Sequence, residues 1–128
     1  MKKVQGIYEK EVRVALLNTF KQVRKDLSPL LDNYKFYDIT LYWWIKKIKK
    51  EGVMGMCYKG VCKIPGIRGW RKNVILLFKN YYETNGMEDL LGVWRHELVH
   101  LVAKDSHGEN FKSLASACGA KRHCPQNK

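Results

Sequence analysis

The chain has 128 residues and a formal net charge of +12, from 24 Lys or Arg residues against 12 Asp or Glu residues. Hydrophobic residues make up 45% and charged residues 28%, which excludes a disordered composition and, with the length, favours one domain over 1–128. No run approaches the roughly 20 apolar residues of a membrane span, and charged residues from Glu9 onward interrupt any apolar stretch of a signal peptide. We therefore expect no signal peptide, transmembrane segment or membrane partner, and a location in the cytoplasm. We also expect a monomer.

The N-terminal half predicts one helix followed by strands. Apolar residues recur every three or four positions over 12–27, which is typical of an amphipathic helix, and Ser28-Pro29 ends it. Phe36–Trp44 is rich in aromatic and β-branched residues and predicts a strand. Met54–Ile64 predicts two short strands joined by a turn at Lys59-Gly60.

The C-terminal half predicts a buried strand and two helices. The strand is the short apolar run Val74–Phe78. A helix is expected from Asn85 to about Lys104, because Asn85 and Glu88 have capping-box spacing. A last helix starts near Gly108, and Gly119 is placed to stop it. The fold class is therefore α+β: an N-terminal helix, a short β-sheet and two C-terminal helices.

Positive charge is concentrated between Ile39 and Tyr82, where ten Lys or Arg residues stand against one acid, Glu51. Such a field favours polyanions, above all nucleic acid, although a solvated surface is the alternative reading. Aromatic side chains interleaved with the charges are candidates to stack on bases. The candidate nucleic-acid contacts are Lys46, Lys47, Lys49, Lys50, Trp44, Trp70 and Arg71, with Trp43 and Tyr58 as further stacking candidates.

The four cysteines form no CxxC pair, so a zinc ribbon is not indicated. Cys57 and Cys62 flank the predicted turn and would face each other across two strands. Free thiols are the expectation in a reducing compartment, with a disulfide or accessory metal site as the alternative. Cys118 and Cys124, with His123 between them, offer a second metal site, although a helix end followed by a tail is the simpler reading.

The run His96-Glu97-Leu98-Val99-His100 is an HExxH motif on the longer C-terminal helix. Residues four apart share one helix face, so His96 and His100 can direct ring nitrogens at one zinc ion, at about 2.0–2.1 Å. Glu97 lies beside the ion as the general base that takes a proton from zinc-bound water. The pattern indicates a zinc metallopeptidase, whereas the alternative is a pair of surface histidines on an ordinary helix.

A catalytic zinc site needs three protein ligands and one open position. His107 is the first candidate for the third ligand, because it follows the helix break at Asp105-Ser106 and starts the next helix. Asp105 is the second candidate and Glu109 the third.

A wider resemblance covers about two thirds of the chain, from about Thr40 to Ala120. In order and approximate spacing it includes Trp44, the Gly55-Met56-Cys57 strand, the apolar strand from Val74, HExxH, and His107-Gly108-Glu109-Asn110-Phe111. This pattern resembles the SprT-like zinc metallopeptidase domain of the Spartan family. The downstream HGxxF and the upstream Gly-x-Cys make the resemblance more specific than HExxH alone.

The resemblance implies a small zincin-like domain with its core at about 36–120, with zinc ligands His96, His100 and His107 and with Glu97 as general base. It also implies an endopeptidase that acts on DNA-associated or DNA-crosslinked proteins, in DNA–protein crosslink repair, and therefore a location with DNA in the nucleoid or nucleus as the alternative to the cytoplasm. Two departures are visible: the gap from His100 to His107 is short for some members, and no C-terminal zinc ribbon or long tail with partner motifs is recognisable. Regulation by such tails is therefore not carried over.

Zincin-like sites hold an extended substrate along an edge strand. The expected substrate strand is Val74, Ile75, Leu76, Leu77 and Phe78. Two other functions stay open: a regulatory protease of the ImmA/IrrE type that cleaves a repressor, and a non-enzymatic nucleic-acid-binding module with structural zinc.

Overall fold

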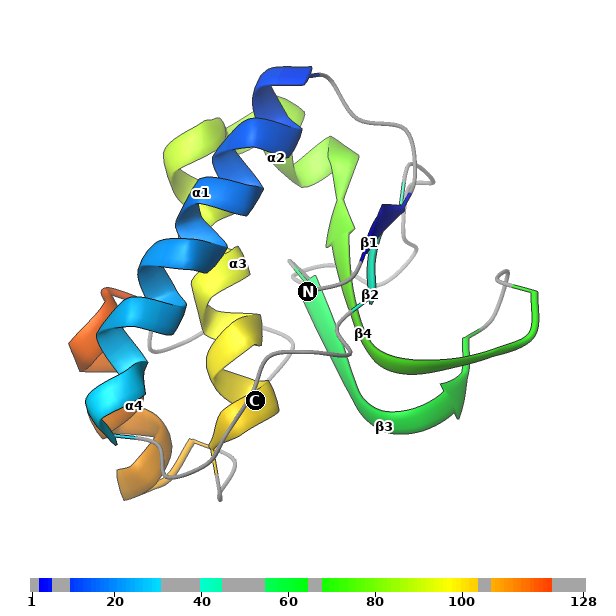
Figure 1. The fold of residues 1–128 in the computed structure, drawn as a ribbon. Helices are drawn as coiled ribbons and strands as arrows, with labels where there is room; N and C mark the ends of the chain where they lie inside the picture. The colour runs from blue at the N-terminus through cyan, green and yellow to red at the C-terminus, as the bar shows by residue number, and fades with distance from the viewer. Residues whose placement is uncertain are drawn as a thin grey trace.

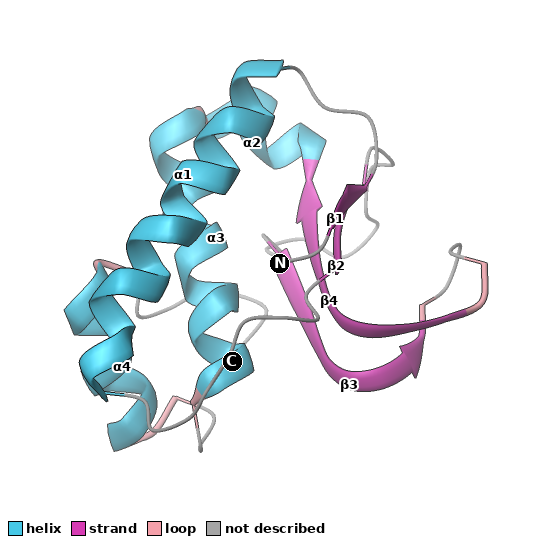
Figure 2. Ribbon diagram, in the orientation of Figure 1, coloured by secondary structure: helices cyan, strands magenta, loops and turns pink. Residues whose placement is uncertain are grey.

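The computed structural model describes residues 3–5, 10–30, 40–44, 55–64, 68–103 and 107–120, and in 3–5 and 40–44 only the backbone. Helices lie against one face of a curved β-sheet (Figures 1 and 2), so the predicted α+β class is confirmed. The elements are β1 (Lys3–Gln5), α1 (Lys10–Leu27) with a 3-10 turn (Ser28–Leu30), β2 (Thr40–Trp44), β3 (Gly55–Lys63), β4 (Trp70–Phe78), α2 (Lys79–Asn85), α3 (Met87–Val102) and α4 (Glu109–Cys118).

The sheet has the strand order β1-β2-β4-β3. Strands β1, β2 and β4 run parallel, and β3 is antiparallel to β4. Because Val74 to Leu77 are aligned with β2 on one side and with β3 on the other, the prediction that Val74–Phe78 is an edge strand is wrong. Within the described sheet, β3 is the edge strand next to β4.

Strand β3 is continuous, so the prediction of two short strands about Lys59-Gly60 is also wrong. The register shifts between Tyr58↔Val74 and Val61↔Lys72, which places two residues of β3 opposite one residue of β4. This β-bulge needs unusual backbone, with φ of 84° at Gly60 and 53° at Asn73. The Gly60 N–H donates to Asn73 Oδ1 at 2.8 Å, which replaces the interrupted ladder bond. Cys57 and Cys62 therefore lie on one strand and do not face each other across a hairpin.

The main core lies between the helices and the sheet. Helices α1, α3 and α4 share one buried apolar cluster with Ile75 and Leu77 of β4, in which α3 lies directly against β4 and α1 and α4 pack on α3. Trp94 is fully buried there, and its indole N–H donates to the Leu16 carbonyl at 3.0 Å, which ties α3 to α1. The opposite face of the sheet carries a second buried cluster made by Ile64, Val74, Leu76 and Phe78.

The helix boundaries differ from the prediction at one place. Asn85 is the last residue of α2, and its side-chain amide donates to the Tyr81 carbonyl at 3.0 Å. Gly86, with φ of 90°, separates α2 from α3 and is the N-cap of α3, so the predicted Asn85–Glu88 capping box is wrong. The predicted stop at Gly119 is confirmed by its left-handed φ of 74° and ψ of 26°.

Across the described residues, the helices do not reach the combination of length and apolar character that crossing a bilayer would demand.

Candidate metal centre

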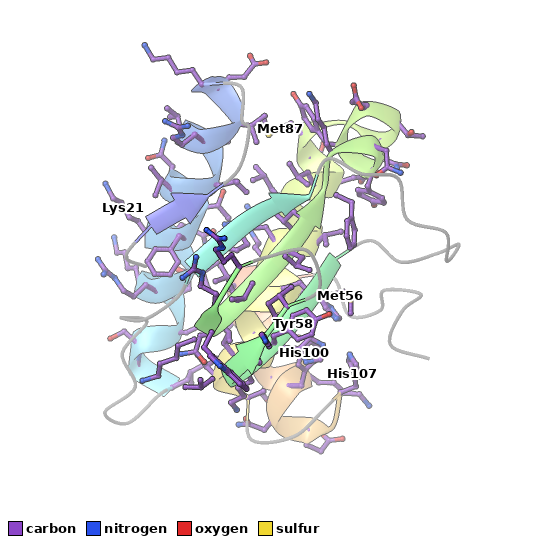
Figure 3. The ribbon with its side chains drawn as sticks, turned by 90° about the vertical axis from the view of Figure 1, so that its right-hand side faces the viewer. Lys21, Met56, Tyr58, Met87, His100 and His107 are labelled. Carbon is purple, nitrogen blue, oxygen red and sulfur yellow. The ribbon has the colours of Figure 1, made fainter. Side chains whose placement is uncertain are left out.

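Three histidine side chains converge where the end of α3 meets the start of α4. His100 Nε2 lies 3.1 Å from His96 Nε2, and His107 Nε2 lies 3.4 Å from the same atom. Each histidine offers a ligand nitrogen within 4.8 Å of the other two. Figure 3 shows His100 and His107 side by side at this end of the molecule. The three residues can therefore hold a metal ion.

Two of the three nitrogen separations fit a tetrahedral ion. Bonds of roughly 2.0–2.1 Å at tetrahedral angles separate neighbouring ligand nitrogens by about 3.3–3.4 Å. The two Nε2 separations, 3.1 and 3.4 Å, lie at this value within a few tenths of an ångström. Three convergent imidazole nitrogens are also a donor set that zinc accepts, leaving one tetrahedral position for another ligand.

The local chain folds so that each ring reaches this point. His96 and His100 are one turn apart on α3, which puts both on one helix face. His107 has a positive φ of 65°, a conformation in which histidine is enriched among non-glycine residues. Gly108 follows as the N-cap of α4, so the chain reverses at His107 and brings its ring back toward α3.

Phe111 forms the floor of the cluster. It is 1% exposed, and its ring centroid lies 4.9 Å from His96, 4.6 Å from His100 and 4.9 Å from His107. A rigid aromatic ring in contact with all three imidazoles restricts their rotamers and excludes water from one side. The last residue of the HGxxF pattern thus has a physical role beside the ligands.

Glu97 is buried at the interface between α3 and β3, with 1% of its surface exposed. Gly55 lets the strand come this close, because a Cβ there would lie 3.4 Å from Glu97 Cγ and only 2.8 Å from Val93 Cγ1. Cys57 follows on the same strand, where burial first and the Glu97 charge second raise the pKa of its thiol. Cys57 is therefore a neutral neighbour of the carboxylate rather than a thiolate.

Burial lowers the pKa of His100 to about 4, with smaller contributions from His96, His107 and the positive charge of Lys59. The neutral imidazole is the metal-binding form, and it is favoured here over the whole range around neutral pH. Lys59 itself donates from Nζ to the Ala103 carbonyl at 3.4 Å, just past the end of α3.

Those of the other sequence-based ligand candidates that the structure describes do not belong to the histidine cluster. Glu109 is exposed on the first turn of α4 and does not belong to the histidine group. Asp105, His123 and Cys124 lie outside the described residues. Cys118 is buried at the end of α4, where its thiol contacts the Ala115 carbonyl at 3.9 Å. Among the described cysteines, Cys57, Cys62 and Cys118 are free thiols.

The candidate nucleic-acid residues do not form one described surface. Trp70 and Arg71 are exposed at the start of β4. Residues 70–72 of β4 pair there with residues 61–63 of β3, and this is the far end of the β3–β4 hairpin. Trp44, of which only the backbone is described, pairs with Phe78 at the other end of β4. Eight residues of strand separate those ends by roughly 25 Å. The run Lys46, Lys47, Lys49 and Lys50 lies outside the described residues.

Sequence reasoning missed Lys59 as a neighbour of the metal centre, because the segment was interpreted as a turn. The Gly-x-Cys-x-Lys alternation was the available signal: in a continuous strand, positions 55, 57 and 59 share one face.

Comparison of the chain with protein-family models, with curated proteins and with solved structures finds no match. The resemblance to the SprT-like family therefore stays a prediction from motifs.

Proposed function

We propose that the protein is a zinc-dependent endopeptidase of zincin-like architecture that acts on DNA-associated proteins. The observation that carries this proposal is the convergence of His96, His100 and His107 at the end of α3 that also carries the buried Glu97. Two histidines one helix turn apart, a third from the turn before the next helix and a carboxylate on the same helix end make up the donor set and the base of metal-assisted peptide hydrolysis.

The roles of the residues follow from their positions. The three histidines would hold the ion, and Phe111 limits their motion. A zinc ion bound there would supply Lewis-acid chemistry, activating water and polarising the substrate carbonyl. Glu97 would act as the general base that accepts a proton from the attacking water and returns it to the leaving amine. Burial between α3 and β3 keeps the carboxylate in a fixed orientation.

We assign substrate binding to β3 in place of the interior strand β4. An extended peptide adds to a sheet only where backbone N–H and C=O groups face outward, which is a property of an edge strand. Strand β3 is also the strand that packs along α3, with Gly55 against Glu97. A peptide paired with β3 therefore lies along the same path as the metal centre.

Association with DNA rests on the charge of the chain and on the far end of the β3–β4 hairpin. Lys63, Arg68, Arg71 and Lys72 are exposed there together with Trp70, which is 65% exposed. Cations combined with an exposed aromatic ring are the combination that binds single-stranded nucleic acid without sequence preference.

The test is proteolysis of a DNA-bound protein by the wild type and by Glu97→Gln, with and without DNA, with zinc content measured on both. The wild type should cut, and DNA should accelerate cutting. Glu97→Gln should retain its zinc and cut roughly 10²–10⁴-fold more slowly than the wild type, because it lacks only the general base.

If both proteins bind zinc and DNA and neither cuts, the metal is structural and the protein is a nucleic-acid-binding module. If one repressor alone is cut and DNA has no effect, a regulatory protease of the ImmA/IrrE type is the better description.

A further inference from the structure

Lys59 stands at the junction of the edge strand and the metal-bearing helix. It occupies the bulge of β3, where Gly60 and Asn73 take up the irregular backbone. Its Nζ donates to the Ala103 carbonyl at 3.4 Å, three residues beyond His100. The ammonium group is thus held within one helical turn of a metal-ligand candidate, while the side chain as a whole remains exposed.

The path of β3 places Lys59 on the same side of the sheet as the metal centre. Gly55 packs against Val93 and Glu97 near the middle of α3, and Lys59 reaches Ala103 at its end. Cys57, between them, packs against the main core under the helices. Positions 55, 57 and 59 therefore follow α3, and a peptide paired with β3 would have every second side chain on this face.

The charged residues of the β3–β4 pair and its connection are all positive. Residues 55–78 contain five cations, Lys59, Lys63, Arg68, Arg71 and Lys72, and no Asp or Glu. A side chain of a paired strand lies about 4.5–5.5 Å, between Cβ atoms, from its direct neighbour, so opposite charges attract across the pair and like charges repel. An acidic substrate segment is favoured on this edge and a basic one is disfavoured.

We propose that Lys59 is a specificity-determining residue that receives an acidic side chain of the substrate next to the scissile bond. This inference rests on the proposed peptidase function. An ammonium group has three N–H donors, and the Ala103 carbonyl accepts one of them. Within the described part of the chain the Ala103 carbonyl is the one hydrogen-bond partner of this group, so its other donors and its positive charge can meet a carboxylate on the face of β3 that points toward the histidines.

A purely structural role for Lys59 makes a different prediction. A lysine that bonds the last carbonyl of a helix and offsets its dipole stabilises the fold whatever the substrate is. Its loss would lower stability and would leave the ratio between acidic and neutral substrates unchanged. The ratio therefore separates the two roles.

The experiment uses matched extended peptides that carry Glu, Gln or Lys at one position, scanned along both sides of the cleaved bond. Binding is measured by fluorescence anisotropy on zinc-loaded Glu97→Gln protein, and cleavage is measured as kcat/KM on the active protein. We expect one position at which Glu is preferred over Gln by roughly three- to tenfold, with the preference shrinking at high salt.

Substitutions at Lys59 then assign the preference. Lys59→Met should abolish it, and Lys59→Glu should reverse it in favour of the Lys peptide. Lys21→Met is the matched control, because Lys21 is an exposed cation on α1, well away from His100 and His107 in Figure 3, and it should leave the preference intact.

The outcomes separate this inference from the peptidase function. Cleavage with equal rates for Glu, Gln and Lys peptides overturns the role of Lys59 and leaves the peptidase standing. Lys59-dependent binding of acidic peptides without any cleavage by the active protein supports the acidic site and overturns the peptidase. A preference that survives Lys59→Met overturns the assignment to this residue.

Discussion

The metal centre and the far end of the β3–β4 hairpin are built in opposite ways. At the metal centre His96 is fully buried and Phe111 is 1% exposed, and each ring contacts the others. At the end of the hairpin Val61 is 66% and Trp70 65% exposed. There the backbone ladder pairs Lys63 with Trp70 and Val61 with Lys72.

The difference shows where sequence change is tolerated and where it is not. A side chain inside a close-packed cluster affects several neighbours when it changes, because interiors have few voids. An exposed side chain on a paired strand affects the surface charge and shape and leaves the ladder intact. We therefore expect substitutions at the metal centre to alter metal binding and stability, and substitutions on the hairpin to alter binding of partners alone.

The largest effect is expected from His96→Ala. His96 Nε2 lies 3.1 Å from His100 Nε2 and 3.4 Å from His107 Nε2, so it is the central nitrogen of the cluster. Its removal leaves only two of the three candidate ligands for the ion. Zinc affinity should fall by more than about 100-fold, since losing an outer partner of a ligand already costs 10–100-fold. Competition with a chromophoric chelator measures it. Unchanged affinity would mean that the ion binds elsewhere.

Gly55→Ala tests the contact between β3 and α3. The new Cβ would lie 2.8 Å from Val93 Cγ1 and 3.3 Å from the Leu76 carbonyl oxygen, so the strand must move or Val93 must shift. The free energy of unfolding should fall by about 1–3 kcal/mol, as for other overpacked sites. Denaturant unfolding measures this change.

Val93→Ala removes one of the two atoms that clash and serves as the partner in a double-mutant cycle. The pair Gly55→Ala and Val93→Ala should lose less stability than the sum of the single variants. Strict additivity would show that the strand and the helix do not press on each other at this point.

The sequence was sufficient to predict elements whose pattern is local. The amphipathic periodicity of 12–27, the HExxH spacing on one helix face and the Gly119 stop each depend on residues within a few positions, and the structure has them as α1, α3 and the end of α4. The grouping of His107 with His96 and His100 was also predicted, because a chain that turns after a helix break can bring a following histidine back to the end of that helix.

The prediction failed where the answer depends on distant residues. Lys59-Gly60 has the composition of a turn, but Asn73, 13 residues away, accepts the Gly60 N–H and turns the site into a bulge within one strand. The sequence predicts Val74–Phe78 as an edge strand, because nothing in the residues of this segment indicates that β2 pairs with it on the side opposite β3. Pairing partners and register are properties of the sheet rather than of the segment.

A smaller effect is expected from pH on the metal-free protein. The pKa of His100 is lowered from 6.5 to about 4 in the fold, chiefly by burial, so between these values the unfolded chain binds more protons than the folded one. Stability should therefore rise with pH from about 4 to 6.5 and level off above that window.

Urea unfolding in the presence of a chelator, at several pH values, measures this slope. His100→Gln is the comparison, because it keeps a polar side chain and removes the titrating group. Its slope over the same window should be flatter than that of the wild type. Equal slopes would assign the pH dependence to other groups.

The smallest effect on stability, and the sharpest test of the contrast, is expected from Trp70→Ser. With 65% of its surface exposed, Trp70 contributes little to the core, so the free energy of unfolding should change by no more than about 0.5 kcal/mol. If its ring stacks on a base, affinity for single-stranded DNA should weaken by about 1–3 kcal/mol. Arg71→Gln should reduce the slope of log affinity against log salt by about 0.7 if its side chain contacts a phosphate.

Trp94→Phe is the matched control, because the same residue type is fully buried there and donates to the Leu16 carbonyl at 3.0 Å. It should reverse the pattern: the Leu16 carbonyl loses its side-chain donor and the core loses part of a buried ring, at a cost of about 1–3 kcal/mol in stability, and DNA affinity stays unchanged. Denaturant unfolding gives the free energy of unfolding of both variants, and anisotropy titration gives their affinities for single-stranded DNA. If Trp70→Ser destabilises the fold as much as Trp94→Phe does, the hairpin is part of the packed structure, and its cations and aromatic ring are held there for stability rather than for a nucleic acid.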